Sequence, residues 1–194
     1  MSKHKFDPKR MAKLDSLERR KILPPEKVLQ HFGIQEGWSV ADIGCGVGYF
    51  SLPISSMLGE NGTLYALDIE DVMVQETQKR AEAKGRKNII SLQSKENILP
   101  LDSDILDAAL MVFLYHELKQ PELFIEEVLR VLKVDGLLYI VDWKKKKTDK
   151  GPPVDHRISE EEVTSTLKQN GFIVEEVIDL SDALYGVRAI KNVE

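Results

Sequence analysis

Cysteine is almost absent from this sequence, which has a single one, Cys45, among 194 residues. One cysteine cannot form a disulfide within the chain, and it cannot supply a cluster of thiolate metal ligands or a relay of reactive thiols. No metal site is therefore expected. Because Cys45 stands between two glycines, we interpret it as a small residue in a crowded loop.

Long apolar runs are also lacking. The longest uncharged stretch, residues 43–59, contains several glycines and Pro53, and the basic N-terminus is not followed by an apolar core. The sequence therefore predicts no membrane span and no secretory signal, and we expect a cytoplasmic protein. With 42% hydrophobic and 30% charged residues, the chain suits one globular domain and leaves no room for a separate substrate domain.

Charge of one sign is concentrated at the N-terminus. The whole chain has a net charge of −5, but residues 1–27 contain nine Lys or Arg against four Asp or Glu, about +5. Such a basic segment can contact RNA or an anionic substrate, although most are simply solvated. The same two interpretations apply to the four consecutive lysines at residues 144–147.

Glycine, in contrast, is concentrated in the stretch Val40–Tyr49. An apolar run ends at a carboxylate, Asp42, and three alternating glycines follow. This pattern predicts a buried strand, a tight loop and a helix, with main-chain N–H groups that a flat ligand can approach. A nicotinamide-dinucleotide site would need glycine where Tyr49 stands, so the spacing disfavours that cofactor.

A second polar position follows the next predicted strand. The apolar run Thr63–Leu67 ends at Asp68, where a nucleoside-binding α/β fold places an acid for the ribose hydroxyls. One carboxylate can accept from both hydroxyls. The alternative is that Asp68 only caps the helix expected to start near Asp71. The glycine loop upstream favours the ribose interpretation.

The pattern Asp42-x-Gly44-x-Gly46-x-Gly48 resembles the first motif of the class I S-adenosylmethionine-dependent methyltransferases, in particular the ubiquinone/menaquinone-biosynthesis-like, type 11/25 group. The resemblance implies a Rossmann-like α/β three-layer sandwich, with a seven-stranded, mostly parallel sheet that ends in a C-terminal antiparallel hairpin. It covers residues 36–194, the expected methyltransferase domain, and residues 1–35 are expected to form an N-terminal helical cap over one edge of the site.

The resemblance also implies S-adenosyl-L-methionine as cofactor and S-adenosyl-L-homocysteine as product. In this family an acid after the third strand contacts the adenine amino group. Lys95 stands at that position here, so we expect Glu96 or Asn97 to accept from the amine, unless this segment is only a solvated loop. The full set of expected cofactor contacts is Asp42, Gly44, Cys45, Gly46, Tyr49, Asp68, Ile69, Glu96, Asn97, Met111 and Val112.

The acceptor pocket is expected at the ends of two further strands. Phe113, Tyr115 and Trp143 are the expected lining residues. His116 is a candidate general base because the pKa of histidine is near neutrality, but it can equally be a residue that hydrogen-bonds a loop. Four lysines and Gly151-Pro152-Pro153 follow Trp143, and they predict a mobile flap.

Periodicity and capping signals predict the remaining elements. Ser159-x-x-Glu162 is a capping box, and the Asp135-Gly136 pair predicts a turn. Pro53 requires the helix after the glycine loop to start late, near Ser51, or to bend. The predicted helices span residues 11–22, 25–31, 51–58, 71–84, 121–132 and 160–170, and the predicted strands span 38–43, 63–68, 88–93, 105–113, 137–142, 172–178 and 184–191.

These features predict an enzyme that transfers a methyl group from S-adenosylmethionine to a small-molecule acceptor by in-line displacement. Two alternatives stay open: methylation of RNA or protein, supported only by the basic segments, and a non-catalytic nucleoside-binding module. Related arsenic methyltransferases use several cysteines, which argues against that substrate. We expect a monomer or a homodimer, with no membrane span and with nucleic acid disfavoured as a partner.

Overall fold

A computed structural model describes residues 8–192. They divide into two compact units, one that ends at Pro100 and one that begins at Leu101. Among the described residues, no helix is long and apolar enough to cross a lipid bilayer.

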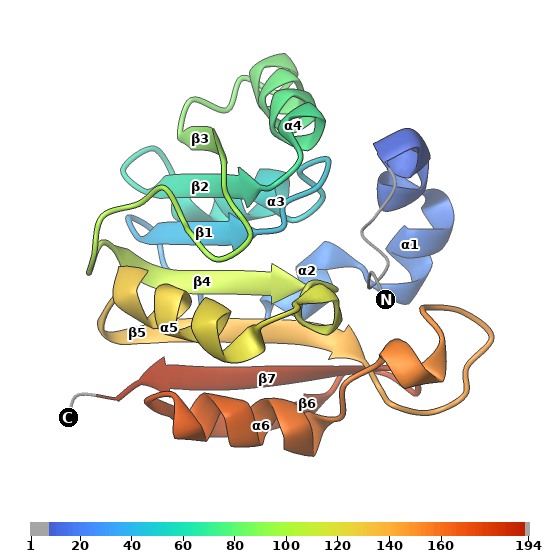
Figure 1. Cartoon of the computed structure of the whole chain (residues 1–194). Coiled ribbons are helices and arrows are strands. Elements are labelled where there is room, and N and C mark those ends of the chain that lie inside the picture. Colours follow the sequence, from blue (N-terminus) through green and yellow to red (C-terminus); the bar gives the residue numbers. More distant parts are fainter. Residues whose placement is uncertain (1–7, 193–194) are drawn as a thin grey trace. The chain divides into compact units, whose positions relative to one another are not determined.

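The first unit contains a parallel sheet of three strands in the order β3-β2-β1. Figure 1 shows the arrows of β1 and β2 running in the same direction. Helix α4 packs on β2 and β3, and α3 packs on β2. The elements of this sheet layer are β1 (Ser39–Ile43), α3 (Ser51–Leu58), β2 (Thr63–Asp68), α4 (Asp71–Ala83) and β3 (Ile89–Gln93).

Helix α3 starts late, as Pro53 requires. Because the helix begins at Ser51, Pro53 lies in the first turn, where its missing N–H group has no partner to lose. Leu58 ends the helix, and Gly59 follows with a φ of 67°.

The segment before β1 differs from the prediction of one helix over residues 11–22. It forms a 3₁₀ helix, η1 (Pro8–Asp15), then α1 (Leu17–Ile22) and α2 (Pro25–Leu29). The interruption is Ser16, whose backbone is extended and whose hydroxyl accepts from the backbone N–H of Arg19 at 3.1 Å. Leu17, predicted on the buried side, is 81% exposed.

The second unit contains a four-stranded sheet in the order β4-β5-β7-β6. Strands β4 and β5 are parallel, while β7 runs antiparallel to both β5 and β6, so the predicted C-terminal hairpin is present (Figure 1). The elements are β4 (Leu106–Val112), η2 (Tyr115–Glu117), α5 (Pro121–Val131), β5 (Leu132–Trp143), η3 (Val154–His156), α6 (Glu160–Gln169), β6 (Phe172–Asp179) and β7 (Leu184–Lys191).

Strand β5 is longer than the predicted 137–142 because the expected turn is a bulge within it. Leu106 pairs with Leu132, but Ala108 pairs with Leu137, so the residues between Leu132 and Leu137 loop out of the ladder. Asp135 has a φ of 61° there, a left-handed conformation that aspartate tolerates better than most residues.

The strap, defined as residues 144–153, is mostly exposed, but its main chain is held by one buried side chain. The side chain of Arg157 is 2% exposed. Its guanidinium donates to four carbonyl oxygens of the strap, those of Lys144 (3.1 Å), Lys146 (2.7 Å), Lys150 (2.9 Å) and Pro152 (2.8 Å). One buried cation thus fixes the path of ten residues.

Candidate functional site

The glycine loop, residues 44–48, joins β1 to α3 with three glycines in the left-handed region. The φ angles of Gly44, Gly46 and Gly48 are 76°, 54° and 78°. The N–H groups of Gly44 and Cys45 both donate to the carbonyl oxygen of Leu67, at 2.8 and 3.0 Å. The loop is therefore fastened to the end of β2 in a conformation that L side chains rarely adopt.

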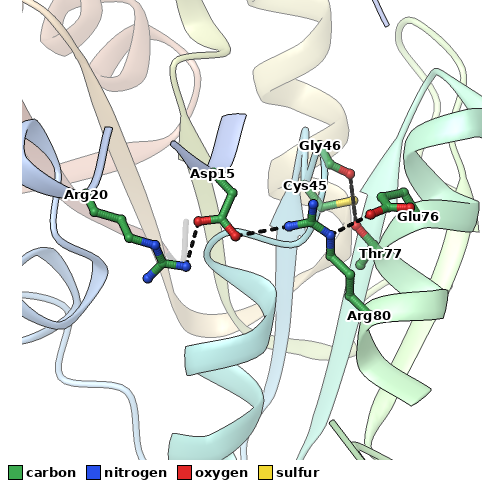
Figure 2. A network of polar contacts seen from close by, with 7 residues as sticks. All are labelled: Asp15, Arg20, Cys45, Gly46, Glu76, Thr77 and Arg80. Carbon is green, nitrogen blue, oxygen red and sulfur yellow. Dashed lines mark hydrogen bonds and ion pairs between the residues drawn. The ribbon is translucent and has the colours of Figure 1, made fainter. Parts of the chain in front are cut away.

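Helix α4 supports the glycine loop through Thr77, a residue that the sequence did not single out. Its hydroxyl donates to the carbonyl oxygen of Gly46 at 2.9 Å (Figure 2). A Cβ atom on Gly48 would lie 3.2 Å from the Thr77 side chain. Cys45 is buried beside them, and burial raises the pKa of its thiol, which agrees with its interpretation as a small packing residue.

Asp68, the last residue of β2, contacts the glycine loop directly. Its Oδ2 accepts from the N–H of Gly46 at 2.9 Å and its Oδ1 accepts from the N–H of Glu70 at 3.0 Å. Helix α4 has no side-chain cap. Burial raises the pKa of Asp68, while these backbone hydrogen bonds oppose the rise. Since a carboxylate has about four acceptor positions, Asp68 can still accept a hydrogen bond from a ligand.

Asp42, at the end of β1, is a buried acid. It is 3% exposed, and its Oδ2 accepts from the hydroxyl of Ser51 at 2.5 Å. Burial raises the pKa of Asp42 to about 6, although the Ser51 hydrogen bond and the nearby guanidinium of Arg19 favour the ionised form. The group therefore titrates close to neutral pH.

The N-terminal segment lies against the glycine loop. A Cβ atom on Gly46 would lie 3.2 Å from Cδ1 of Leu14. The hydroxyl of Tyr49 donates to the carbonyl oxygen of Leu23 at 2.7 Å, and the guanidinium carbon of Arg19 lies 4.8 Å from the centroid of the Tyr49 ring. The N-terminal segment is therefore in contact with the glycine loop and with Tyr49.

A network of ion pairs fixes this segment to α4. Asp15 pairs with Arg20 at 2.6 Å and with Arg80 at 3.0 Å, and Arg80 also pairs with Glu76 at 2.6 Å. Figure 2 shows that Arg80 and Thr77 project from the same helix, one toward Asp15 and the other toward Gly46. Helix α4 thus contacts both the glycine loop and the N-terminal segment.

The predicted adenine segment begins beside Asp68, since the N–H of Ser94 donates to the carbonyl oxygen of Asp68 at 2.9 Å. The segment turns at once, with an isolated bridge between Lys95 and Ile98. Within this turn Glu96 is exposed and Asn97 is partly exposed.

In the second unit, the predicted pocket residues follow β4 and end β5. Met111 and Val112, the last two residues of β4, are buried. Phe113 follows with a φ of 57°, an unusual value for an aromatic residue. Its ring stacks on that of Trp143, with centroids 4.9 Å apart and planes 17° apart. The structure therefore brings Phe113 and Trp143 together.

His116 is held by Asp142, which sequence analysis placed only as the end of the strand. The backbone N–H of His116 donates to Oδ2 of Asp142 at 3.1 Å, and its Nδ1 lies 2.7 Å from Oδ1. With Asp142 ionised, the neutral imidazole carries its proton on Nδ1. Asp142 also accepts from the N–H of Trp143 at 2.8 Å, so one carboxylate orients both residues.

Tyr115 has a different environment from Phe113 and Trp143. Its side chain is 3% exposed and lines a cavity of about 460 Å³ against the start of α6. Burial raises the pKa of its phenol, and a hydrogen bond with Thr166 opposes the rise.

Comparison with known proteins identifies the family of this chain. The sequence model of the ubiE/COQ5 methyltransferase family matches residues 3–151, a range that contains the glycine loop, Asp68, His116 and Trp143. The chain belongs to this family.

Relatives within and around the ubiE/COQ5 family agree with the assignment. A crystal structure of a SAM-dependent methyltransferase from Aquifex aeolicus is 41% identical to the chain, with a TM-score of 0.92 over 96% of this chain and 100% of that one. A demethylmenaquinone methyltransferase from Desulfitobacterium hafniense is 26% identical over 62% of this chain and 48% of its own length. An Azotobacter vinelandii ubiquinone/menaquinone biosynthesis C-methyltransferase is 29% identical over 58% and 45%.

This ubiE/COQ5 family member spans about half the length of the curated relatives that it matches. The structural match with the Aquifex protein confirms the Rossmann-like methyltransferase fold predicted from the glycine loop. The family match confirms the predicted membership of the class I methyltransferases.

Proposed function

We propose that this chain binds S-adenosylmethionine and transfers its methyl group to a small-molecule acceptor by in-line displacement, with S-adenosylhomocysteine as product. The observation that carries the proposal is the hydrogen bond between Asp68 and the N–H of Gly46. Through this hydrogen bond, the acid that we expect to bind the ribose contacts the glycine loop, whose sequence is typical of the family.

The residues of the first unit fit this cofactor. The three left-handed glycines provide main chain without side chains, and Asp68 is the carboxylate that would accept from the ribose hydroxyls. The proposed cofactor contacts in this unit are Asp42, Gly44, Cys45, Gly46, Tyr49, Asp68, Ile69, Glu96 and Asn97, and those in the second unit are Met111 and Val112. The cofactor itself supplies an electrophilic methyl group on a positively charged sulfur.

The residues of the chain contribute charge, position and water exclusion. Asp42 has a pKa of about 6, so at pH 7 most molecules present a carboxylate. That carboxylate is buried, and a cation beside it is attracted more strongly than in water. Asp68 is held at both oxygens by backbone N–H groups, so its orientation is set before a ligand arrives.

His116 has two possible roles in this proposal. As a base, it would remove a proton from an acceptor that is protonated at the working pH, with Asp142 fixing the tautomer. As a structural residue, it would only anchor the turn after Phe113 to β5. A His116→Asn variant separates them: the first role predicts loss of turnover with unchanged S-adenosylhomocysteine affinity and stability, and the second predicts lower stability.

The proposed acceptor class is a small planar molecule. The Phe113–Trp143 pair presents stacked aromatic rings, and the curated relatives are named for quinone biosynthesis. RNA is disfavoured because two strap lysines are already paired, Lys144 with Asp179 and Lys145 with Glu162. We also propose a cytoplasmic monomer or homodimer in which residues 1–35 act as a cap and residues 36–194 form the methyltransferase domain.

Calorimetry with S-adenosylhomocysteine tests cofactor binding. Asp68→Ala should weaken binding about ten- to a hundredfold, because a hydrogen bond to a charged group contributes about 1.5–3 kcal/mol. Asp68→Asn, which keeps one carbonyl acceptor, should have an intermediate effect. The matched control Asp71→Ala removes an exposed carboxylate three residues later and should bind like the wild type.

Turnover should be measured as methyl transfer from labelled S-adenosylmethionine to separate pools of small quinols, RNA and protein. The proposal expects transfer to a small molecule. Binding of S-adenosylhomocysteine without transfer to any pool would favour the non-catalytic nucleoside-binding module. Absence of binding by the wild type would overturn the proposal.

A further inference from the structure

Gly46 is held at both of its main-chain polar groups by side chains from two different elements. Its N–H donates to Oδ2 of Asp68 at 2.9 Å. Its carbonyl oxygen accepts from the hydroxyl of Thr77 at 2.9 Å (Figure 2). Because the N–H and the C=O of a residue lie on opposite sides of its two rotatable backbone bonds, the two hydrogen bonds together fix Gly46 in its left-handed conformation, with a φ of 54°. A glycine without such restraints has more accessible conformations than any other residue.

Thr77 lies inside α4, and it is completely buried against the glycine loop. A threonine in a helix commonly donates to a carbonyl of its own helix one turn earlier, whereas this hydroxyl donates to a loop residue 31 positions earlier in the chain. The Sγ of Cys45 lies 3.8 Å from the same hydroxyl. Because Thr77 is withdrawn from solvent, it presents no surface to a ligand, and its effect on binding must pass through the loop.

The carboxylate of Asp68 depends on Gly46 for the position of one of its two oxygens. Oδ1 accepts from the N–H of Glu70 at 3.0 Å, a local contact two residues along the chain. Oδ2 accepts from Gly46, and this bond connects the carboxylate to the glycine loop. A change in the orientation of the Gly46 N–H therefore changes the direction in which the remaining acceptor positions of Asp68 point. Burial makes each of these hydrogen bonds stronger than it would be in water.

Thr77, Gly46 and Asp68 thus form a chain of two hydrogen bonds that ends at the proposed ribose acid. We infer that Thr77 is a positioning residue for cofactor binding. Its hydroxyl fixes Gly46, and the N–H of Gly46 fixes the carboxylate of Asp68 in the orientation that receives the ribose hydroxyls. The inference rests on the proposed function and adds to it a residue that does not contact the ligand. A site whose groups are already oriented loses less conformational freedom on binding, so Thr77 raises the affinity for the nucleoside.

The test compares Thr77→Ser with Thr77→Ala. Both variants lose the threonine methyl group, so they leave similar cavities and only the hydroxyl separates them. Calorimetry with S-adenosylhomocysteine should give a dissociation constant about three- to tenfold higher for Thr77→Ala than for Thr77→Ser, because the alanine variant lacks one hydrogen bond. Thr77→Ser, which keeps the hydroxyl, should recover most of the wild-type affinity.

The same comparison in an Asp68→Ala background determines whether the effect passes through Asp68. If it does, the ratio of the two dissociation constants should fall below about twofold there, because the residue that Thr77 positions is missing. A merely structural role for Thr77 would give the same ratio in both backgrounds, since the two residues would then act independently. An equal ratio in the two backgrounds, or equal affinities of Thr77→Ser and Thr77→Ala with Asp68 present, would overturn the inference and leave the proposed function standing.

The matched control is Thr164, a threonine of α6 in the second unit whose hydroxyl also donates to a carbonyl oxygen, that of Glu161 at 3.1 Å. Thr164→Ser and Thr164→Ala should bind S-adenosylhomocysteine equally well in both backgrounds. Melting temperatures measured without ligand show whether each variant is folded. A wild type that does not bind S-adenosylhomocysteine would overturn the proposed function itself.

Discussion

Asp42 shows at the scale of one residue how burial and binding oppose each other. A carboxylate that is 3% exposed has lost most of its hydration, and its pKa of about 6 reflects that loss. Ionisation of Asp42 therefore lowers the stability of the folded chain. A ligand that brings positive charge to the same place recovers part of this cost, which couples proton release to binding.

The pH dependence of stability tests this state of Asp42. Because the pKa is raised from 3.8 to about 6, the folded state holds a proton that the unfolded state has lost, and wild-type stability falls as pH rises through this window. Relative to Asp42→Asn, the free energy of unfolding should fall by about 2 kcal/mol between pH 4 and 6, by on the order of 3 kcal/mol in total, and become level above about pH 7. Urea titrations at several pH values measure it. A difference independent of pH would contradict the assignment.

The candidate site residues whose positions in the fold were predicted correctly are acids at the ends of strands. Asp42 and Asp68 each end an apolar run, so their place at the carboxyl end of a parallel strand follows from the pattern. Thr77 and Arg19 gave no comparable signal, because each meets the loop through tertiary packing of a helix. A threonine inside a helix and an arginine in a basic run have no distinctive spacing.

At the scale of elements, the strap shows that amino-acid composition alone does not predict how a segment is held. Four lysines, a glycine and two prolines predict an unpacked segment, yet Arg157, four residues after the strap, donates to four of its carbonyl groups. Gly151 also rests on the ring of Trp143, where a Cβ atom would lie 2.7 Å from Cδ2. The strap's own residues do not indicate these hydrogen bonds, because the donor, Arg157, lies outside the strap.

Limited proteolysis tests the role of Arg157. Trypsin cleaves after lysine, and the strap contains Lys144–Lys147 and Lys150 as built-in cleavage sites. Arg157→Ala should increase the cleavage rate at these sites severalfold, because the strap carbonyls lose their common donor and local opening becomes easier. Mass spectrometry identifies the cut positions.

Arg188→Ala is the matched control, since Arg188 pairs with Glu175 on the neighbouring strands β7 and β6. It should leave strap cleavage unchanged. Equal cleavage of wild type and Arg157→Ala would mean that the strap is held by its other contacts.

The predicted boundaries of helices and strands were wrong where a side-chain hydrogen bond or a bulge changed the structure that periodicity predicts. Ser16 divides the first predicted helix because its hydroxyl accepts from a backbone N–H within the segment. The Asp135-Gly136 pair does reverse locally, but β5 continues on both sides of it. The capping box at Ser159 and the two C-terminal strands were predicted closely, since their signals are local.

At the scale of the whole molecule, the proposed cofactor contacts are concentrated in the unit that ends at Pro100. Nine of the eleven proposed contacts lie there, around the ends of β1, β2 and β3. The C-terminal hairpin contains none of them. The fold class was predicted from the resemblance of the glycine loop to the class I methyltransferases, and the alternation of predicted strands and helices fits that resemblance.

Hydrogen exchange tests this distribution. S-adenosylhomocysteine at about a hundred times its dissociation constant should stabilise the chain by about 2.7 kcal/mol and raise its melting temperature. Peptides that contain residues 44–49 and 68–70 should gain the most protection, and peptides from β6 and β7 should gain the least. Protection that is largest in the C-terminal hairpin would contradict the proposed site.

The stacked position of Trp143 has a practical consequence for future work. The chain has only two tryptophans, Trp38 and Trp143. Replacing Trp38 with phenylalanine would leave one indole, which is in contact with Phe113 and lies 5.4 Å from the Arg157 guanidinium carbon. Its emission spectrum would then work as an intrinsic optical sensor, in which displacement of the strap changes brightness and colour in real time without any attached dye.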